Sequence, residues 1–282
     1  MKVDLDRPGI IGVGVVGGAV RNYFEFAGIQ PLLFDPNKGL GSLATINQAS
    51  VVYICVPTPY VAARGFDDSA VVEAIGLLTG EKVVVVKSTV LPGTTEKLQS
   101  RFPQHRVLFN PEFLREASAN DDFINPDRQI VGYCNDDTDV ASAVLSTLPR
   151  APHEAVVPAS VAEMTKYATN SFLALKVIFA NELYDLCEAL DVDYELVKHG
   201  FGVDQRIGAS HLDVHDAGYR GYGGKCLPKD TMSLLDLADE LGIAMKLLEA
   251  AHDVNARLRE PTPFRRFEVF AEAAVPSARK AS

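Results

Sequence analysis

The hydrophobic pattern of the first half of the chain alternates between short apolar runs and stretches of helical periodicity. The runs are rich in β-branched residues and several end at Pro or Gly, which is typical of buried strands. Such alternation predicts a parallel sheet with helices on both faces. Strands are predicted at 10–13, 31–35, 51–56, 83–86, 107–109 and 129–133, and helices from the turn after residue 13 to about 28 and at 68–78, 94–102 and 137–148.

The pattern changes near residues 149–158. From Ser160 to about Leu190, apolar residues recur at steps of three and four, which predicts one long helix. Ser160 and Glu163 have the spacing of a capping box at its start. Further helices are predicted at 195–199, 229–241 and 243–259, and Pro261 and Pro263 end the last one.

Composition and charge narrow the class of protein. Hydrophobic residues make up 47% and charged residues 23%, which indicates a soluble globular chain. No apolar run approaches the roughly 20 residues needed to cross a bilayer, and the N-terminus lacks an apolar signal core, so we expect a cytoplasmic protein without a membrane partner. A net charge of −10 argues against nucleic acid but not against a phosphorylated small substrate. The four cysteines and six histidines show no metal-ligand spacing, so no metal is assigned.

A GxGxxG motif stands at residues 12–17, after the first predicted strand and at the start of a helix. This context is typical of a dinucleotide site, where glycines let the backbone approach the pyrophosphate. Asp35 ends the next strand, and its carboxylate would accept hydrogen bonds from ribose hydroxyls and repel a 2′-phosphate. We therefore expect NAD rather than NADP. The alternative is a structural turn beside a surface Asp.

The segment Gly221–Asp230 combines a glycine cluster with a cysteine and a helix start. Pro228 suits the first turn of a helix, which puts Cys226 just before the helix N-terminus, between Lys225 and Lys229. Both features favour a thiolate, so Cys226 is predicted to be an activated nucleophile. The alternative is a buried inert cysteine, which is our interpretation of Cys55, Cys134 and Cys187.

With these motifs in order, the sequence resembles the UDP-glucose/GDP-mannose dehydrogenase family. The hallmark is its GFGG-x-C-x-PKD segment, which is similar to Gly221–Asp230. Six other segments resemble family motifs in the same order: Gly12–Gly17 (GxGxxG), Cys55–Pro59 (CVPTP), Lys87–Val90 (STV), Asn110–Glu116 (NPEFLRE), Glu163–Asn170 (Lys and Asn four apart on the long helix) and Asp204–Gly208 (D-x-RIG).

The resemblance implies that the chain oxidises the primary alcohol of a nucleotide sugar, such as UDP-glucose, to a carboxylate with two NAD in succession. Cys226 would carry the thiohemiacetal and thioester. Lys166 would stabilise oxyanions, and Asn170 would hold the substrate. Asp230 would orient water or transfer a proton, Glu116 would be the base for thioester hydrolysis, Glu112 would position water or substrate, and Thr89 would add a hydroxyl to a bound water.

The resemblance also implies two binding sets. NAD would contact Gly12, Gly14, Val15, Val16, Gly17, Asp35, Lys38, Val56, Pro57, Thr58, Thr89 and Glu116. The nucleotide sugar would contact Glu112, Phe113, Leu114, Lys166, Asn170, Arg206, Tyr222 and Gly223, with Arg206 as a substrate or interface contact.

The expected organisation is an α/β N-terminal Rossmann-type NAD-binding domain (1–155), then an all-α domain for dimerisation and substrate binding that carries the cysteine loop (156–260), and a tail (261–282). The long helix would pair with a second copy, giving a homodimer. We expect the second nucleotide-fold domain of the family to be absent, so that Lys225, Lys229 and Arg220 take over some phosphate binding. Val15 and Lys225 depart from the usual family residues, and the segment between Arg206 and Gly221 is longer than expected.

Two alternatives remain open at this stage. A two-electron β-hydroxyacid or 6-phosphogluconate-type dehydrogenase would also pair a Rossmann domain with a helical domain, but leaves the cysteine segment unexplained. A non-catalytic nucleotide-binding protein would keep the dimer surface but has no use for the catalytic residues.

Overall fold

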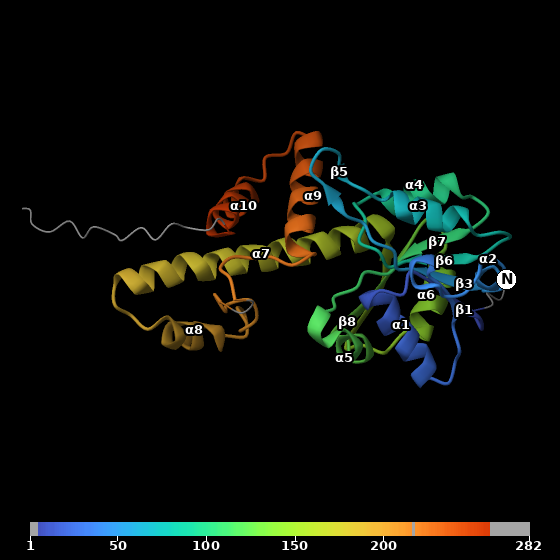
Figure 1. The fold of residues 1–282 in the computed structure, drawn as a ribbon, viewed down its shortest axis with the longest axis horizontal. Helices are drawn as coiled ribbons and strands as arrows, with labels where there is room; N and C mark the ends of the chain where they lie inside the picture. The colour runs from blue at the N-terminus through green and yellow to red at the C-terminus, as the bar shows by residue number, and fades with distance from the viewer. Residues whose placement is uncertain (1–4, 216–217, 260–282) are drawn as a thin grey trace, which may run out of the picture.

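The computed structural model describes residues 5–215 and 218–259 (Figure 1). Its main sheet has the strand order β2-β1-β3-β6-β7-β8-β9. The strands are β1 (Pro8–Ile11), β2 (Leu32–Phe34), β3 (Val51–Ile54), β6 (Val83–Val86), β7 (Arg106–Phe109), β8 (Arg128–Tyr133) and β9 (His153–Pro158).

The predicted parallel sheet is confirmed except at β8, which is antiparallel to β7. The connection between β7 and β8 contains a 3₁₀ turn (Glu116–Ser118) and the short α5 (Ala119–Ile124) but no long crossover helix. The chain therefore re-enters the sheet at the edge where it left. The edge strand β9 was not predicted. Its residues are half-buried or exposed, which weakens the apolar signal.

Helices cover both faces of the sheet. The alternation of side chains along each strand divides the core, as in β6, where Val84 and Val86 face one layer and Val83 and Val85 the other. On one face lie α2 (Leu43–Ile46), α3 (Ser69–Gly76) and α4 (Thr94–Arg101), and on the other α1 (Val15–Phe26), α5 and α6 (Thr138–Thr147).

The long helix α7 (Ala159–Ala189) joins the sheet to the helical part of the chain. Its first turn packs on β8 where Gly132 leaves room, since a Cβ there would lie 2.8 Å from the Ala159 Cα. The predicted capping box is wrong, because Pro158 is the N-cap and Glu163 turns instead to α4. The Glu163 carboxylate accepts hydrogen bonds from the backbone N–H of Gly93 (2.6 Å) and Thr95 (2.8 Å).

Three further helices complete the fold. Figure 1 shows α8 (Tyr194–Gly202) on one side of α7, and α9 (Leu227–Glu240) and α10 (Lys246–Arg259) on the other. A small hairpin, β4 (Tyr60–Val61) with β5 (Gly65–Phe66), reaches α9, where the Tyr60 hydroxyl donates to Asp236 (2.7 Å).

The two-part architecture agrees with the sequence, although the predicted boundary at residue 155 falls inside β9 and the predicted tail at 261–282 lies outside the described residues. Within the described ranges, no helix has the length and apolar content to cross a membrane.

Candidate active site

The glycine-rich turn between β1 and α1 has the shape of a phosphate cradle. Gly12 has a φ of 85°, and a Cβ there would lie 2.7 Å from the Cys55 carbonyl oxygen. A Cβ at Gly17 would lie 2.0 Å from the Gly12 oxygen, whereas Gly14 has no atom within 4 Å of its Cβ position. The turn thus requires glycine where backbone packs on backbone and is open at the N-terminus of α1, where amides without side-chain caps can hold an anion.

Asp35 and Lys38 hold this turn from the end of β2. The buried Asp35 carboxylate accepts a hydrogen bond from the Val13 N–H (2.9 Å), and the Lys38 ammonium donates to the Val13 carbonyl. A carboxylate beside the turn is the arrangement that binds a ribose diol in dinucleotide sites. These residues fit a nicotinamide dinucleotide.

The other residues predicted to contact the cofactor follow neighbouring strands at the same edge of the sheet. Val56, Pro57 and Thr58 follow β3, and Thr89 follows β6. The Thr58 hydroxyl donates to the Thr89 carbonyl (2.8 Å), which joins the two strand ends. Glu116 lines both the hollow beside Gly14 and Val15 and the cleft described next.

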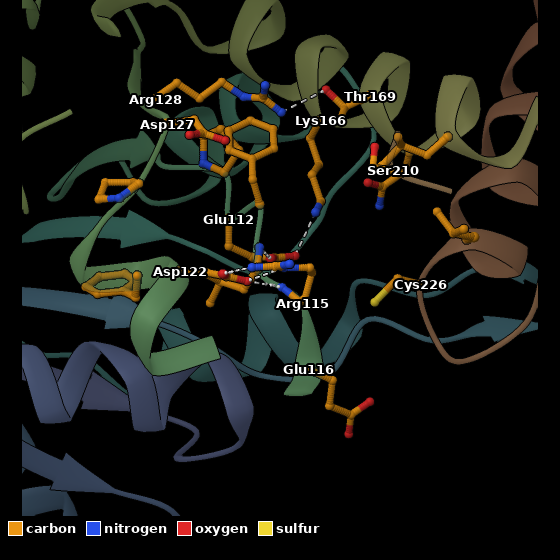
Figure 2. Close-up of a pocket in the computed structure, with 18 of the residues that line it drawn as sticks. Glu112, Arg115, Glu116, Asp122, Asp127, Arg128, Lys166, Thr169, Ser210 and Cys226 are labelled. Atoms are coloured by element: carbon orange, nitrogen blue, oxygen red, sulfur yellow. Dashed lines mark hydrogen bonds and ion pairs between the residues drawn. The ribbon is translucent and has the colours of Figure 1, made fainter. Parts of the chain in front are cut away.

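A cleft of about 630 Å³ lies between the α/β part and the helical part (Figure 2). It brings together residues that the sequence predicted to act in one site. They come from the segment after β7, from α7 and from the cysteine loop: Glu112, Phe113, Leu114, Glu116, Lys166, Asn170, Gly223 and Cys226.

The centre of the cleft holds a buried ion pair. The Lys166 ammonium lies 2.8 Å from the Glu112 carboxylate, with side-chain exposures of 4% and 10%. Burial acts to raise the Glu112 pKa, but Lys166 and the Leu114 N–H (2.8 Å) outweigh it and lower that pKa below its ordinary value. Glu112 precedes the short 3₁₀ turn Glu116–Ser118, and its side chain points into the cleft and not into solvent.

A second network connects α7 to α9. Asp230 is buried (1% exposed), and its carboxylate accepts hydrogen bonds from the Asn170 amide (2.6 Å) and the Lys229 ammonium (2.5 Å). Both carboxylate oxygens therefore have a partner, and the orientations of Asn170 and Asp230 are fixed relative to each other.

Cys226 is the N-cap of α9, as predicted. Figure 2 shows its thiol pointing into the cleft, between Glu116 and Lys166. The residue as a whole is exposed, but its thiol is partly desolvated by the groups around it. The predicted lowering of its pKa is wrong: burial raises the thiol pKa, Glu112 and Asp230 add to this, and Lys166 and Lys229 compensate only in part. The Lys229 ammonium is paired with the Asp230 carboxylate, and the Lys225 side chain is 87% exposed.

Several predicted residues are not brought to the cleft. Arg206 is 89% exposed and pairs with Asp204 (2.5 Å), and the Tyr222 side chain is buried against Ala174 and Ile178. Thr89 lies at the strand edge outside the cleft lining. Arg220, suggested for phosphate, pairs instead with Asp185 (2.7 Å).

The cleft residues that the sequence analysis did not assign to the site include two cations, Lys87 and Arg128. Lys87 directly follows four valines of β6, and a lysine ending a buried strand was the available signal. Arg128 begins β8, and its guanidinium stacks 3.8 Å from the centroid of the Phe113 ring, a contact that no local pattern could indicate.

The fold and the cleft together define a class of protein: an α/β dinucleotide-binding domain joined by one long helix to a helical domain, with a cysteine at the junction. Comparison with known proteins specifies the family. Residues 41–148 match the NAD binding domain, and residues 160–257 the central domain, of the UDP-glucose/GDP-mannose dehydrogenase family.

Individual relatives agree. The chain is 37% identical over 230 residues to a UDP-glucose 6-dehydrogenase of Bacillus subtilis, covering 77% of this chain and 48% of the relative. It is 39% identical over 228 residues to one of Pseudomonas aeruginosa, covering 75% and 49%. The solved structure of a UDP-glucose dehydrogenase from Pyrobaculum islandicum superposes with a TM-score of 0.77 at 30% identity, over 91% of this chain and 69% of that one. The chain belongs to the UDP-glucose/GDP-mannose dehydrogenase family, and it spans about half the length of the curated relatives it matches.

Proposed function

We propose that this chain oxidises the primary alcohol of a nucleotide sugar of the UDP-glucose type to a carboxylate, through a covalent bond to Cys226. The observation that carries the proposal is the meeting of Cys226 with Glu112, Lys166 and Asn170 in one cleft between the two parts of the chain. NAD, bound at the glycine-rich turn, would supply the hydride acceptor for each of two oxidations.

The covalent route accounts for a four-electron oxidation without release of an aldehyde. The first oxidation removes a hydride and the hydroxyl proton, which leaves an aldehyde. The Cys226 sulfur then adds to the aldehyde carbon, its proton passes to the new hydroxyl, and a thiohemiacetal forms. Loss of a second hydride and the hydroxyl proton gives a thioester. Water breaks the carbon–sulfur bond, which yields the carboxylate, regenerates the thiol and releases a proton.

The neighbouring side chains have roles that their geometry supports. Lys166 and Asn170 are buried on one face of α7, where fixed donors stabilise the oxyanion of each tetrahedral stage. Glu116 is exposed between the cofactor turn and Cys226, a position from which a carboxylate can activate the water that attacks the thioester. Asp230 orients Asn170. Glu112 holds Lys166 in place.

A homodimer is part of the proposal. The exposed face of α7 carries Phe172, Phe179 and Leu186, with 63%, 58% and 55% exposure. Large apolar side chains at this exposure are typical of an interface.

The test is NADH stoichiometry on a panel of UDP-glucose, UDP-N-acetyl sugars and GDP-mannose. We expect two NADH per sugar oxidised by the wild-type chain, and loss of this product in Cys226→Ala. Cys187→Ala is the matched control. It removes a buried thiol on α7, outside the cleft lining, and should keep the stoichiometry. Two NADH per substrate from Cys226→Ala would contradict the covalent route, and one NADH with no need for Cys226 would favour a two-electron dehydrogenase.

A further inference from the structure

Lys87 is a buried lysine in the floor of the cleft. It directly follows β6, its residue exposure is 2%, and it lines the cleft together with Glu112 and Cys226. Its ammonium donates to the Asn110 side-chain oxygen (2.6 Å) and, at 3.4 Å, to the Asn110 carbonyl. The Phe123 ring lies 5.2 Å away on another side.

The charges around Lys87 do not balance. The neighbouring carboxylate, Glu112, is paired with Lys166 at 2.8 Å. Among the described residues, no carboxylate oxygen lies within 4.0 Å of the Lys87 ammonium. When all three groups are ionised, Lys87, Lys166 and Glu112 form a buried set with one positive charge in excess.

A buried ammonium without a counter-ion is costly, and the pKa of Lys87 reflects this cost. The pKa is lowered to about 8, chiefly by burial; Cys55 and Glu112 act to raise it, and Lys166 adds to the lowering. An anion that enters or forms in the cleft would therefore stabilise the Lys87 ammonium.

Lys87 is also connected to Glu112 through the backbone. Its partner Asn110 is fully buried and donates to the Ile130 carbonyl (2.8 Å), which fixes the chain where it leaves β7. Pro111 and Glu112 follow directly. The Lys87–Asn110 contact thus holds the point in the chain from which the Glu112 segment enters the cleft.

We propose that Lys87 is a positioning residue that fixes the Glu112 segment through Asn110 and gives the resting cleft the positive charge that an anion at Cys226 balances. The proposal rests on the proposed function, in which these anions are the Cys226 thiolate and the oxyanion of the thiohemiacetal.

The experiment measures the potential at Cys226 without any sugar substrate. The rate of Cys226 alkylation is followed by mass spectrometry with iodoacetate, an anion, and with neutral iodoacetamide. Both reagents react with the thiolate, so the ratio of the two rates does not depend on the ionised fraction of Cys226. The ratio therefore reports the local charge. The variants are Lys87→Met, Lys87→Arg and Lys82→Met. Lys82 is a matched control because it is also buried, stands just before the same strand, and donates to the Ala49 and Asn47 carbonyls at 2.7 and 2.9 Å.

We expect Lys87→Met to lower the iodoacetate-to-iodoacetamide ratio by roughly 3- to 10-fold, and Lys87→Arg and Lys82→Met to keep it. The wild-type ratio should fall as the pH rises through 8, while that of Lys87→Arg stays level. This second comparison needs no Lys87→Met protein, so it decides the question even if that variant does not fold.

An unchanged ratio in Lys87→Met, or equal pH dependence in wild type and Lys87→Arg, would overturn the proposal. The readout is separate from the proposed function, since alkylation proceeds whether or not the chain oxidises nucleotide sugars. If the chain oxidises nucleotide sugars, Lys87→Met should reduce kcat by a larger factor than it changes KM. Lys87→Arg should restore part of kcat.

Discussion

At the scale of single residues, the cleft is built from buried charges whose partners are far away in sequence. The Glu112 charge is compensated by Lys166 from α7, whereas Asp230 is paired with its neighbour Lys229 and accepts a hydrogen bond from Asn170 on α7. A buried carboxylate that loses its cation is strongly destabilising, because its charge stays buried without compensation. The cleft therefore contributes to stability as well as to chemistry.

Lys166→Met tests this pairing. We expect the unfolding free energy at pH 8 to fall by about 3 kcal/mol, because ionised Glu112 is left buried without its cation. The loss should shrink at pH 5, where Glu112 can take up a proton. Lys176→Met is the control, since Lys176 lies on the same helix and donates only to the Ile207 and Gly208 carbonyls. Urea unfolding at both pH values measures the effect, and equal losses in the two variants would count against it.

At the scale of elements, the N-termini of α1 and α4 each depend on particular residues. The glycine-rich turn opens α1, and its two neighbouring glycines differ sharply. A Cβ at Gly17 would collide with the Gly12 oxygen at 2.0 Å, whereas a Cβ at Gly18 meets no atom within 4 Å. The N-terminus of α4 is different, because its amides are capped by Glu163 from α7.

The paired variants Gly17→Ala and Gly18→Ala test the turn. We expect Gly17→Ala to abolish NADH binding, since the turn must move to admit a methyl group. Gly18→Ala should bind NADH normally and gain about 0.5–1 kcal/mol of stability from helix propensity. NADH fluorescence titration and urea unfolding provide the measurements, and normal NADH binding by Gly17→Ala would refute the geometry.

Glu163 makes the contact between α4 and α7 sensitive to pH. Burial raises its pKa from 4.5 to about 7, despite the hydrogen bonds from Thr95 and Gly93. The folded chain thus binds more protons than the unfolded chain between these values, and the unfolding free energy falls as pH rises from about 4.5 to 7, by ~3 kcal/mol.

Glu163→Gln should remove this part of the pH dependence, because an amide does not ionise. Glu182→Gln, an exposed position on the same helix, should retain it. Urea unfolding at several pH values from 4.5 to 7.5 distinguishes the two, and an unchanged slope in Glu163→Gln would show that another group is responsible.

At the scale of the whole molecule, α7 connects the two parts of the chain. Its first turns pack on the sheet, Lys166 and Asn170 enter the cleft, and α9, α10 and α8 pack along the rest of its length (Figure 1). The exposed side chains Phe172, Phe179 and Leu186 repeat at a constant step on this helix, since 179 − 172 and 186 − 179 are both 7. This spacing places them in one stripe.

We expect the wild-type chain to be a dimer and Phe179→Glu to be a monomer, because a charge in the stripe opposes its burial. Leu241→Glu is the control, since Leu241 is 65% exposed but lies beyond α9, away from the stripe. Light scattering coupled to gel filtration measures the masses. A monomeric wild type, or dissociation by both variants alike, would exclude α7 as the interface.

The sequence by itself determined the order of the main strands and helices, the glycine-rich turn and the place of Cys226 before α9. These features depend on near neighbours in the chain, through hydrophobic periodicity and backbone freedom. It also indicated which side chains belong to one site, because family motifs preserve their order.

The tertiary structure alone decided how those side chains are paired and which charges are buried. The antiparallel β8, the Glu112–Lys166 pair, the contact of Glu163 with α4 and the burial of Lys87 all depend on residues distant in sequence. The Cys226 pKa shows the difference most clearly. Its sequence neighbours are lysines, which favour a thiolate, but burial and the carboxylates of Glu112 and Asp230 raise the pKa in the folded chain. Desolvation and charge pairing are set by the whole surroundings of a group, and local sequence contains only part of them.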